Sequence, residues 1–266
     1  MVGSINGLIC LSHELREKLI ILWNPAIDKY VRLPVPAPAR SIRSHSPECI
    51  LGFGFDSRTY DYKVVRIVYG LNTFESEVDV YELSTGMWRS SIGSAALPYP
   101  MIVCHTSHVF VNGASHWIAR RGNGYLILSF DMCSEVFKVM MPPDAVANGG
   151  PVLRLSVAPF GDYVSLFEYR CGTIMSCCIW VMKEYGVASS WTRLFIVDIG
   201  RRSKVLGFRK TGEVVVRMDD CSLVSYGPNS KKDIGISAKQ YSFRLVPYLE
   251  SLVLLGRKNI LKGPIM

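Results

Sequence analysis

Short apolar stretches that end in an aromatic side chain recur along the chain of 266 residues. Five aromatic residues mark these stretches at separations of 58, 49, 50 and 46 positions: Trp23, Tyr81, Phe130, Trp180 and Tyr226. In the first three units a second aromatic follows seven positions later, as Tyr30, Trp88 and Phe137, and in the fourth the interval is stretched, to Trp191. Strand-like units repeated at such a spacing predict a β-propeller or a related array.

Each unit also contains a hairpin ahead of its aromatic pair. Asn112-Gly113 and Asn6-Gly7 each separate two apolar stretches. Asn-Gly favours the type I′ turn, in which both central residues have positive φ. Further turns are predicted between apolar stretches at Asp56–Asp61, Phe160–Asp162 and Thr211-Gly212. A hairpin plus an aromatic pair gives about four strands in each unit, the content of one propeller blade.

The predicted fold is therefore all-β, a kelch-like propeller of about five to six four-stranded blades. The apolar segment Tyr241–Leu255 has strand content that could complete a blade, and only Glu14–Ile21 shows a weak helical pattern. The abrupt start of the first unit leaves open whether the array is complete at its N-terminus and whether it closes. No change in composition divides the chain, so residues 1–266 are predicted to form one domain, with a disordered tail over residues 256–266.

Composition agrees with a folded domain, because 49% of the residues are hydrophobic and 20% are charged. No apolar run reaches the roughly 18 residues that would span a membrane, and the first residues do not resemble a signal peptide. Eight cysteines occur without a CxxC pair. Most lie in apolar, strand-like contexts, where a reduced thiol behaves as a small hydrophobe. We therefore expect a cytoplasmic or nuclear protein with no membrane partner.

The formal net charge of +8 could attract nucleic acid or an acidic protein. The basic residues are scattered, however, and the doublets are short: Arg120-Arg121, Arg201-Arg202 and Lys231-Lys232. No nucleic-acid-binding motif accompanies them. We therefore expect no direct binding to nucleic acid.

Few residues have the spacing of a chemical site. Cys104, His105 and His108 could contribute to a zinc site, but nothing else at ligand spacing joins them. The side chains of Cys177 and Cys178 are expected on opposite faces of a strand, which favours core packing over joint ligation. No nucleophile elbow, phosphate-binding loop or dinucleotide fingerprint is present. The sequence thus predicts no catalytic residue, no metal and no cofactor.

Several motifs, in order along nearly the whole chain, are similar to those of the plant F-box-associated interaction domain, found in F-box/kelch-like and S-locus F-box-like proteins. The motifs that carry this resemblance are Leu22–Pro25, Gly52–Asp56, Asp61–Arg66, Trp180–Gly186 and Tyr248–Leu252. The regular double glycines of true kelch repeats are missing. The resemblance covers both the repeated units and the chain end.

This resemblance implies a non-catalytic substrate adaptor of a Skp–cullin–F-box ubiquitin ligase, which binds target proteins for ubiquitination. Nothing before Asn6 supplies the helical bundle of an F-box. We therefore expect the chain to bind a target protein and to reach the ligase scaffold only if an F-box is supplied. Two alternatives stay open: a propeller enzyme or glycan-binding lectin, and a truncated, non-functional remnant.

A target-binding surface is expected on the loops at one end of the propeller, because loops carry most binding residues. The repeated aromatics are instead expected to pack between blades. Arginine and aromatic side chains in loops are favoured contact types. The candidate protein-binding residues are Arg40, Arg43, Phe74, Tyr99, Arg121 and Arg201.

Overall fold

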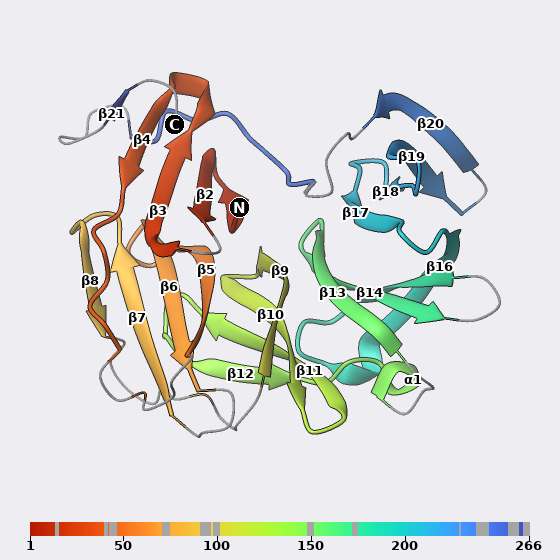
Figure 1. Ribbon diagram of the computed structural model, residues 1–266, viewed down its shortest axis with the longest axis horizontal. Helices are drawn as coiled ribbons and strands as arrows, with labels where there is room; N and C mark the ends of the chain where they lie inside the picture. Colours follow the sequence, from red (N-terminus) through yellow and green to blue (C-terminus); the bar gives the residue numbers. More distant parts are fainter. Residues whose placement is uncertain are drawn as a thin grey trace.

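The computed structural model contains five antiparallel sheets that follow one another around a ring (Figure 1). It describes residues 1–13, 16–39, 42, 47–70, 75–90, 97, 102–147, 152–171, 175–228, 230–237, 245–254 and 261–262. Each sheet is one blade, and its first four strands are neighbours in sequence order. The prediction of an all-β, kelch-like propeller is confirmed, with five blades.

The blades use nearly all of the described strands. The first two blades comprise β1 (Gly3–Ile5), β2 (Leu8–His13), β3 (Arg16–Asn24), β4 (Lys29–Arg32), β5 (Glu48–Asp56), β6 (Asp61–Tyr69), β7 (Ser76–Glu82) and β8 (Met87–Ser90). The next two comprise β9 (Ile102–Val111), β10 (Ala114–Arg121), β11 (Gly124–Asp131), β12 (Phe137–Met140), β13 (Val152–Phe160), β14 (Tyr163–Cys171), β15 (Met175–Met182) and β16 (Trp191–Ile199). The fifth comprises β17 (Lys204–Phe208), β18 (Val214–Arg217), β19 (Ser222–Gly227) and β20 (Ser230–Ser237). The described parts of the connections contain three short helices: η1 (Pro25–Ile27), α1 (Asp144–Ala147) and η2 (Ala188–Ser190).

The strand register explains the interval of seven residues between paired aromatics. Trp23 lies directly opposite Tyr30, Tyr81 opposite Trp88, and Phe130 opposite Phe137, each across the third and fourth strands of a blade. Opposed side chains in antiparallel strands are close enough to contact each other. In the fourth blade Trp191 lies opposite Met182, and Trp180 lies opposite Arg193. The stretched interval in the sequence reflects the longer connection between β15 and β16, which contains the short helix η2.

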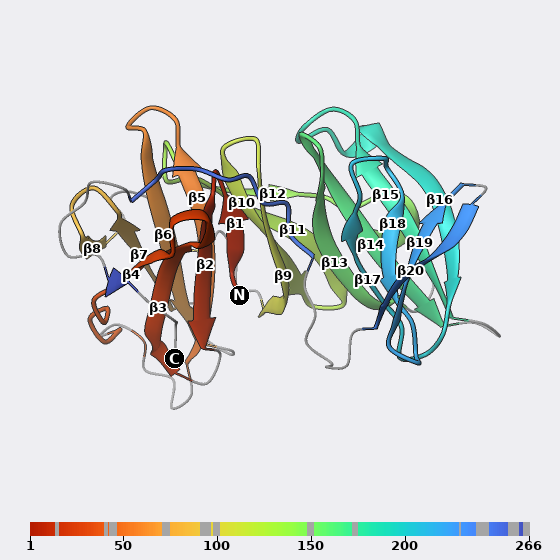
Figure 2. The same cartoon turned by 90° about the horizontal axis from the view of Figure 1, so that it is seen from above.

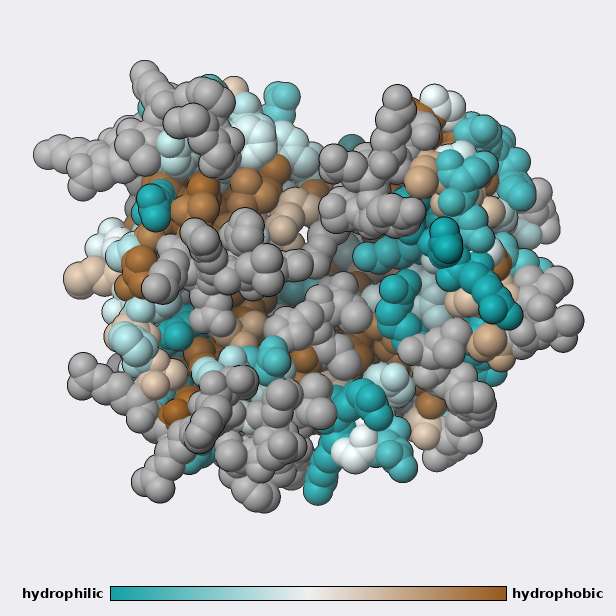
Figure 3. Space-filling view, in the orientation of Figure 1, coloured by the Kyte–Doolittle hydropathy of each residue, from teal (hydrophilic) through white to brown (hydrophobic). Residues whose placement is uncertain are grey.

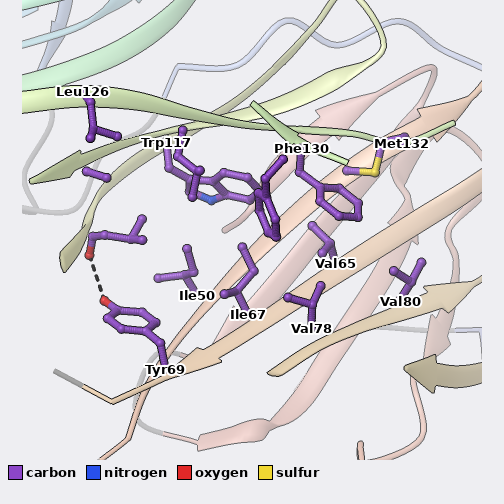
Figure 4. Packing of buried hydrophobic residues seen from close by; sticks show 14 residues of the cluster. Ile50, Val65, Ile67, Tyr69, Val78, Val80, Trp117, Leu126, Phe130 and Met132 are labelled. Carbon is purple, nitrogen blue, oxygen red and sulfur yellow. Dashed lines mark hydrogen bonds between the residues drawn. The ribbon is translucent and has the colours of Figure 1, made fainter. Parts of the chain in front are cut away.

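Four clusters of buried hydrophobic residues fill the four interfaces between consecutive blades. Figure 4 shows the cluster between the second and third blades, where Trp117 lies over the side chains of β5 and β6. Phe130 and Phe137 belong to this cluster, and Tyr81 with Trp88 to the preceding one. The prediction that the repeated aromatics pack between blades is confirmed for these four and for Trp180 and Trp191, whereas Trp23 belongs to none of the four described clusters. Tyr69 also donates a hydrogen bond to the carbonyl of Val103 across this interface, at 3.1 Å.

Two glycines allow the second and third blades to approach closely. A Cβ at Gly52 would lie 2.5 Å from the Trp117 ring, and one at Gly54 would lie 2.5 Å from Met132. Both distances are far below a van der Waals contact. The Gly52–Asp56 motif thus leaves room for two large side chains of the next blade.

Local turn signals predicted the hairpins correctly, whereas one helical signal was wrong. Asn112 and Gly113 have φ values of 51° and 73°, as a type I′ turn requires. The segment Glu14–Ile21, which had a weak helical pattern, instead enters β3 from Arg16 onward. Pairing of β3 with β2 and β4 overrides the weak local preference.

The C-terminal segment crosses the side of the ring between the fifth and first blades (Figures 1 and 2). Asn24 donates hydrogen bonds to the carbonyls of Ser251 and Val253 at 2.9 and 2.8 Å, and Leu254 is buried against the first blade. Residues 245–254, which we call the C-terminal strap, contain no strand. The prediction that Tyr241–Leu255 forms a blade strand is therefore wrong for the described part. Hydrogen bonds from the side chain of Asn24, rather than pairing with a neighbouring strand, hold the strap.

Part of the predicted tail pairs with the first blade. Leu261 and Lys262 form β21, which lies antiparallel to β4 and opposite Tyr30 and Lys29. The rest of residues 256–266 lies outside the described part of the chain. Within the described residues, no helix is long and apolar enough to cross a membrane.

Candidate protein-interaction face

Strand order places all of the predicted binding loops at one end of the propeller. In a blade whose strands alternate in direction, the connections after the second and fourth strands emerge at the same end. The predicted loops are of these two kinds: they join β4 to β5, β6 to β7, β8 to β9, β10 to β11 and β16 to β17. We call this end the loop face, and the opposite end, which carries the connections after the first and third strands, the turn face.

Arg121 lies on the loop face at the tip of the hairpin between β10 and β11. It is exposed and stands opposite Gly124 across a tight turn at Gly122, whose φ is 57°. The guanidinium of the adjacent Arg120 lies 5.6 Å from the centre of the Tyr125 ring. This short hairpin therefore presents two arginines and an aromatic side chain, which are residue types favoured in protein contacts.

Arg201 lies on the same face in the connection between the fourth and fifth blades. This turn is held by Asp219, which accepts hydrogen bonds from the Arg202 amide at 2.9 Å and the Ser203 hydroxyl at 2.8 Å. Arg217 donates a further hydrogen bond to the Arg202 carbonyl at 2.7 Å. The turn backbone is therefore fixed, while the side chain of Arg201 is exposed.

The other candidates fall in parts of the chain that the structure does not describe. Arg40, Arg43, Phe74 and Tyr99 all lie outside the described residues. Their connections join strand ends that belong to the loop face. Of the six candidates, the structure therefore places two, Arg121 and Arg201, on one face of the molecule.

Two further arginines on the loop face were missed by the sequence analysis. Arg170 ends β14 and donates hydrogen bonds to the Glu168 carboxylate and, at 3.2 Å, to the Ala145 carbonyl of α1. The hydrogen bond to Glu168 raises the pKa of Arg170, so this side chain stays charged. Arg154, near the start of β13, lies 4.4 Å from the centre of the Tyr169 ring. A cation at the end of a predicted strand was the signal that could have identified both.

These residues make the loop face of the third to fifth blades rich in arginine, although the same end also carries the exposed carboxylates Asp144, Asp198, Asp219 and Asp220. Its described arginines are Arg120, Arg121, Arg154, Arg170, Arg201 and Arg202, with the buried Arg217 beneath the turn at Arg202. Figure 3 shows mainly hydrophilic surface on the right-hand side, over β13 to β20. Arginine can form paired hydrogen bonds with a carboxylate or phosphate.

The turn face, in contrast, is held together by a buried ionic cluster. Glu135, from the turn between β11 and β12, reaches the second blade and accepts hydrogen bonds from Lys63 at 3.1 Å and from Arg89. Lys63 is 3% exposed and also contacts Asp56 at 2.8 Å. Burial alone would raise the pKa of Asp56, but Lys63 and nearby backbone amides lower it to about 2. The cluster therefore links two blades.

His108, one of the residues that could suggest a metal site, has structural partners. The amide of Phe53 donates to His108 Nε2 at 3.2 Å, and His108 Nδ1 lies 3.3 Å from the carbonyl of Val2. This pattern places the proton on Nδ1 and links β9 to β5 and to Val2, which directly precedes β1. The side chains of Cys104 and His105 lie outside the described residues. Among the residues that are described, no three His, Cys, Asp or Glu side chains form a potential metal site.

Of the described cysteines, Cys10, Cys177 and Cys178 are buried, Cys49, Cys133 and Cys221 are partly exposed, and Cys171 is exposed. Cys177 and Cys178 are both buried in β15, on opposite sides of the sheet, so the prediction of core packing is confirmed. Burial raises the pKa of Cys10 to about 12. Such thiols are poor nucleophiles at neutral pH.

Comparison with known proteins agrees with this architecture. The model of the F-box associated beta propeller domain family matches residues 2–253. The chain belongs to this family. The match includes all five blades and nearly the whole C-terminal strap, so the resemblance stated from the motifs is confirmed.

Curated relatives from Arabidopsis thaliana are F-box proteins. The chain is 29% identical over 202 residues to an F-box/kelch-repeat protein, covering 74% of this chain and 52% of that protein. It is 29% identical over 286 residues to the F-box protein CPR1, with coverage of 95% and 67%. A third F-box protein is 28% identical over 283 residues, with coverage of 87% and 64%. The chain thus spans about half to two thirds of the length of these relatives.

Proposed function

We propose that this chain is the target-recognition domain of a Skp–cullin–F-box ubiquitin ligase adaptor. The observation that carries the proposal is the family match over residues 2–253. Relatives at 28–29% identity are named as F-box proteins. In this role the propeller binds a target protein, and an F-box supplied with it binds the ligase scaffold. The domain itself does no chemistry, and we propose that it works in the cytoplasm or nucleus.

The loop face is the proposed contact surface for the target. It combines exposed arginines with backbone turns that are fixed by hydrogen bonds, such as the Asp219 contacts beneath Arg201. Fixed turns reduce the conformational entropy that is lost on binding. The excess of arginine favours a target with an acidic or phosphorylated contact surface.

A double charge reversal tests this assignment. Arg121→Glu combined with Arg201→Glu changes two exposed side chains of the loop face. The matched control, Lys183→Glu with Lys210→Glu, changes the same number of charges at exposed positions of the turn face. Neither double variant should change the free energy of unfolding by more than about 0.5 kcal/mol per site.

The measurement is quantitative affinity capture from plant extract with the purified chain and both double variants. We expect a set of proteins that is captured equally by the unchanged chain and the turn-face control, and that is lost with the loop-face variant. Equal capture by all three would refute the assignment of the loop face. Loss of captured proteins with the turn-face control alone would indicate that the target binds at the turn face instead.

A further inference from the structure

The interface between the fifth and first blades differs from the other four interfaces of the ring. Those four are filled by clusters of buried hydrophobic side chains. Among the residues that the structure describes, no such cluster joins the fifth blade to the first. Instead, a cavity of about 220 Å³ is lined by the inner strands β1 and β17 of these two blades, by β9 and β13, and by residues 245–247 of the C-terminal strap.

The C-terminal strap forms one wall of this cavity and contacts the blades on either side of it. Leu245 lies so close to β17 that a Cβ at Gly207 would be 3.5 Å from its side chain. Further along the strap, the carbonyl oxygen of Leu249 would be 2.9 Å from a Cβ at Gly7, in the first blade. A molecule in the cavity would therefore contact the first blade, the fifth blade and the segment that connects them.

The size and lining of the cavity suit a small hydrocarbon ring. Apolar side chains from all of the surrounding strands and from the strap line it, among them Ile5, Phe110, Val157, Phe167, Leu206 and Val246. An apolar protein cavity of about 150 Å³ is large enough to bind benzene. The cavity here is larger, so it has room for a substituted ring.

The charged groups of the lining favour a neutral ligand. The lining residues include no aspartate or glutamate, and the two basic ones, His108 and Lys204, both have partners within the protein. The ring nitrogens of His108 contact Phe53, Ser115 and Val2. A charged ligand would therefore lose its hydration without gaining a free counter-charge, whereas a neutral ring loses little hydration.

We propose that this cavity binds a neutral, mostly hydrocarbon molecule that contains one ring. The ring lies against the apolar side chains of the inner strands and of the strap. Because the ligand contacts both the first and the fifth blades, its binding stabilises the closed arrangement of the ring of blades. The cavity lies inside the propeller, so binding there does not depend on the target-recognition role.

The first test compares three probes of nearly equal size: neutral toluene, the anion benzoate and the protonated amine benzylamine. Binding to the full chain is measured by calorimetric titration, and the site is located from methyl NMR shifts of Val157 and Leu206. We expect saturable binding of toluene, with shifts at both residues, and binding of the two charged probes that is at least about tenfold weaker. Absence of saturable toluene binding, shifts confined to residues outside the cavity, or equal or tighter binding of either charged probe would overturn the proposal.

The second test fills the cavity with a side chain. Val246→Trp on the strap and Leu206→Trp on β17 each replace a half-buried lining residue with a larger ring. Both should weaken toluene binding by about tenfold or more, because the indole occupies the space of the ligand. Leu252→Trp is the matched control, since Leu252 is an exposed strap residue that does not line the cavity. A cooperative melt of each variant confirms folding, and toluene affinity equal to that of the control in both filled variants would refute the location of the site.

A third measurement needs no variant. Saturating toluene should slow amide hydrogen exchange in the strap, because the ligand adds contacts to a segment that has no strand pairing of its own. Exchange in β11, which does not line the cavity, serves as the internal reference. Strap exchange that toluene leaves unchanged would refute the claim that the ligand stabilises the closure between the first and fifth blades.

Discussion

Replacing Glu135 with glutamine removes one charge from the buried ionic cluster between the second and third blades. Glu135 accepts hydrogen bonds from Lys63 at 3.1 Å and from Arg89 Nη1 at 2.9 Å. Removing one partner of a buried ion pair costs about 3–5 kcal/mol when the other charge is left alone. Lys63 keeps Asp56 and Arg89 keeps Glu82. We therefore expect a smaller loss, about 2–3 kcal/mol in the free energy of unfolding.

Urea denaturation at pH 7, followed by tryptophan fluorescence, measures this loss. With an m value of about 2–3 kcal/mol/M, the midpoint should fall by about 1 M. Glu184→Gln is the matched control, because Glu184 is exposed in the corresponding turn of the fourth blade. Its expected change is below about 0.5 kcal/mol. A similarly small change in Glu135→Gln would refute the proposed link between the blades.

The destabilisation caused by Glu135→Gln should also depend on pH. Burial works to raise the pKa of Glu135, but hydrogen bonds from Arg89 and Lys63 hold it below its ordinary value. A carboxylate whose pKa is lowered on folding stabilises the protein above its unfolded pKa of about 4.3. That contribution is lost as the pH falls through the lowered value. The stability gap between the unchanged chain and Glu135→Gln should therefore shrink below about pH 4, and an equal gap at pH 3 and 7 would contradict the reasoning.

Three further substitutions test the packing of the blades and the strap. Phe130→Ala should lower the free energy of unfolding by about 3–5 kcal/mol, because the ring is fully buried between blades; a melting temperature equal to that of the unchanged chain would contradict this. Tyr169→Phe should cost about 1–2 kcal/mol in urea denaturation, since its hydroxyl accepts a hydrogen bond from the Val205 amide at 3.0 Å; no loss would mean that the hydroxyl is dispensable. Asn24→Ala should speed amide hydrogen exchange in residues 248–254, and unchanged exchange would show that the strap is held by other contacts.

The sequence predicted those parts of the fold that depend on local pairing. The interval between Tyr81 and Trp88 fits a two-strand register, and Asn112-Gly113 fits one turn type. Each of these patterns involves residues only a few positions apart, so it can be recognised without knowledge of the remaining chain. Repetition of the same pattern then indicated the number of blades.

Contacts between blades could not be predicted in the same way. Glu135 resembles an ordinary acidic turn residue, and only the ring geometry brings it to Lys63, 72 positions away. The path of the C-terminal strap was predicted wrongly for a related reason. Its apolar residues have strand composition, but it is held by the buried side chain of Asn24, which is more than 220 positions away. Neither Asn24 nor the C-terminal strap contains a sequence pattern that predicts contact with the other.

The candidate site was predicted only in outline. Arg121 and Arg201 were found because they lie in predicted loops, and strand order alone places both on the loop face. Arg170 was missed because it stands at the end of a strand, where its partners Glu168 and the α1 carbonyl appear only after folding.

Reconstituted ubiquitination tests the central proposal most directly. The chain is joined behind an F-box, assembled with the ligase scaffold, and supplied with a protein from the set captured by the unchanged chain. We expect ubiquitin transfer to that protein by the unchanged chain and by the Lys183→Glu, Lys210→Glu control, and its loss with Arg121→Glu, Arg201→Glu. Transfer that is the same for all three, or that occurs with the F-box but without this chain, would contradict a role in target recognition.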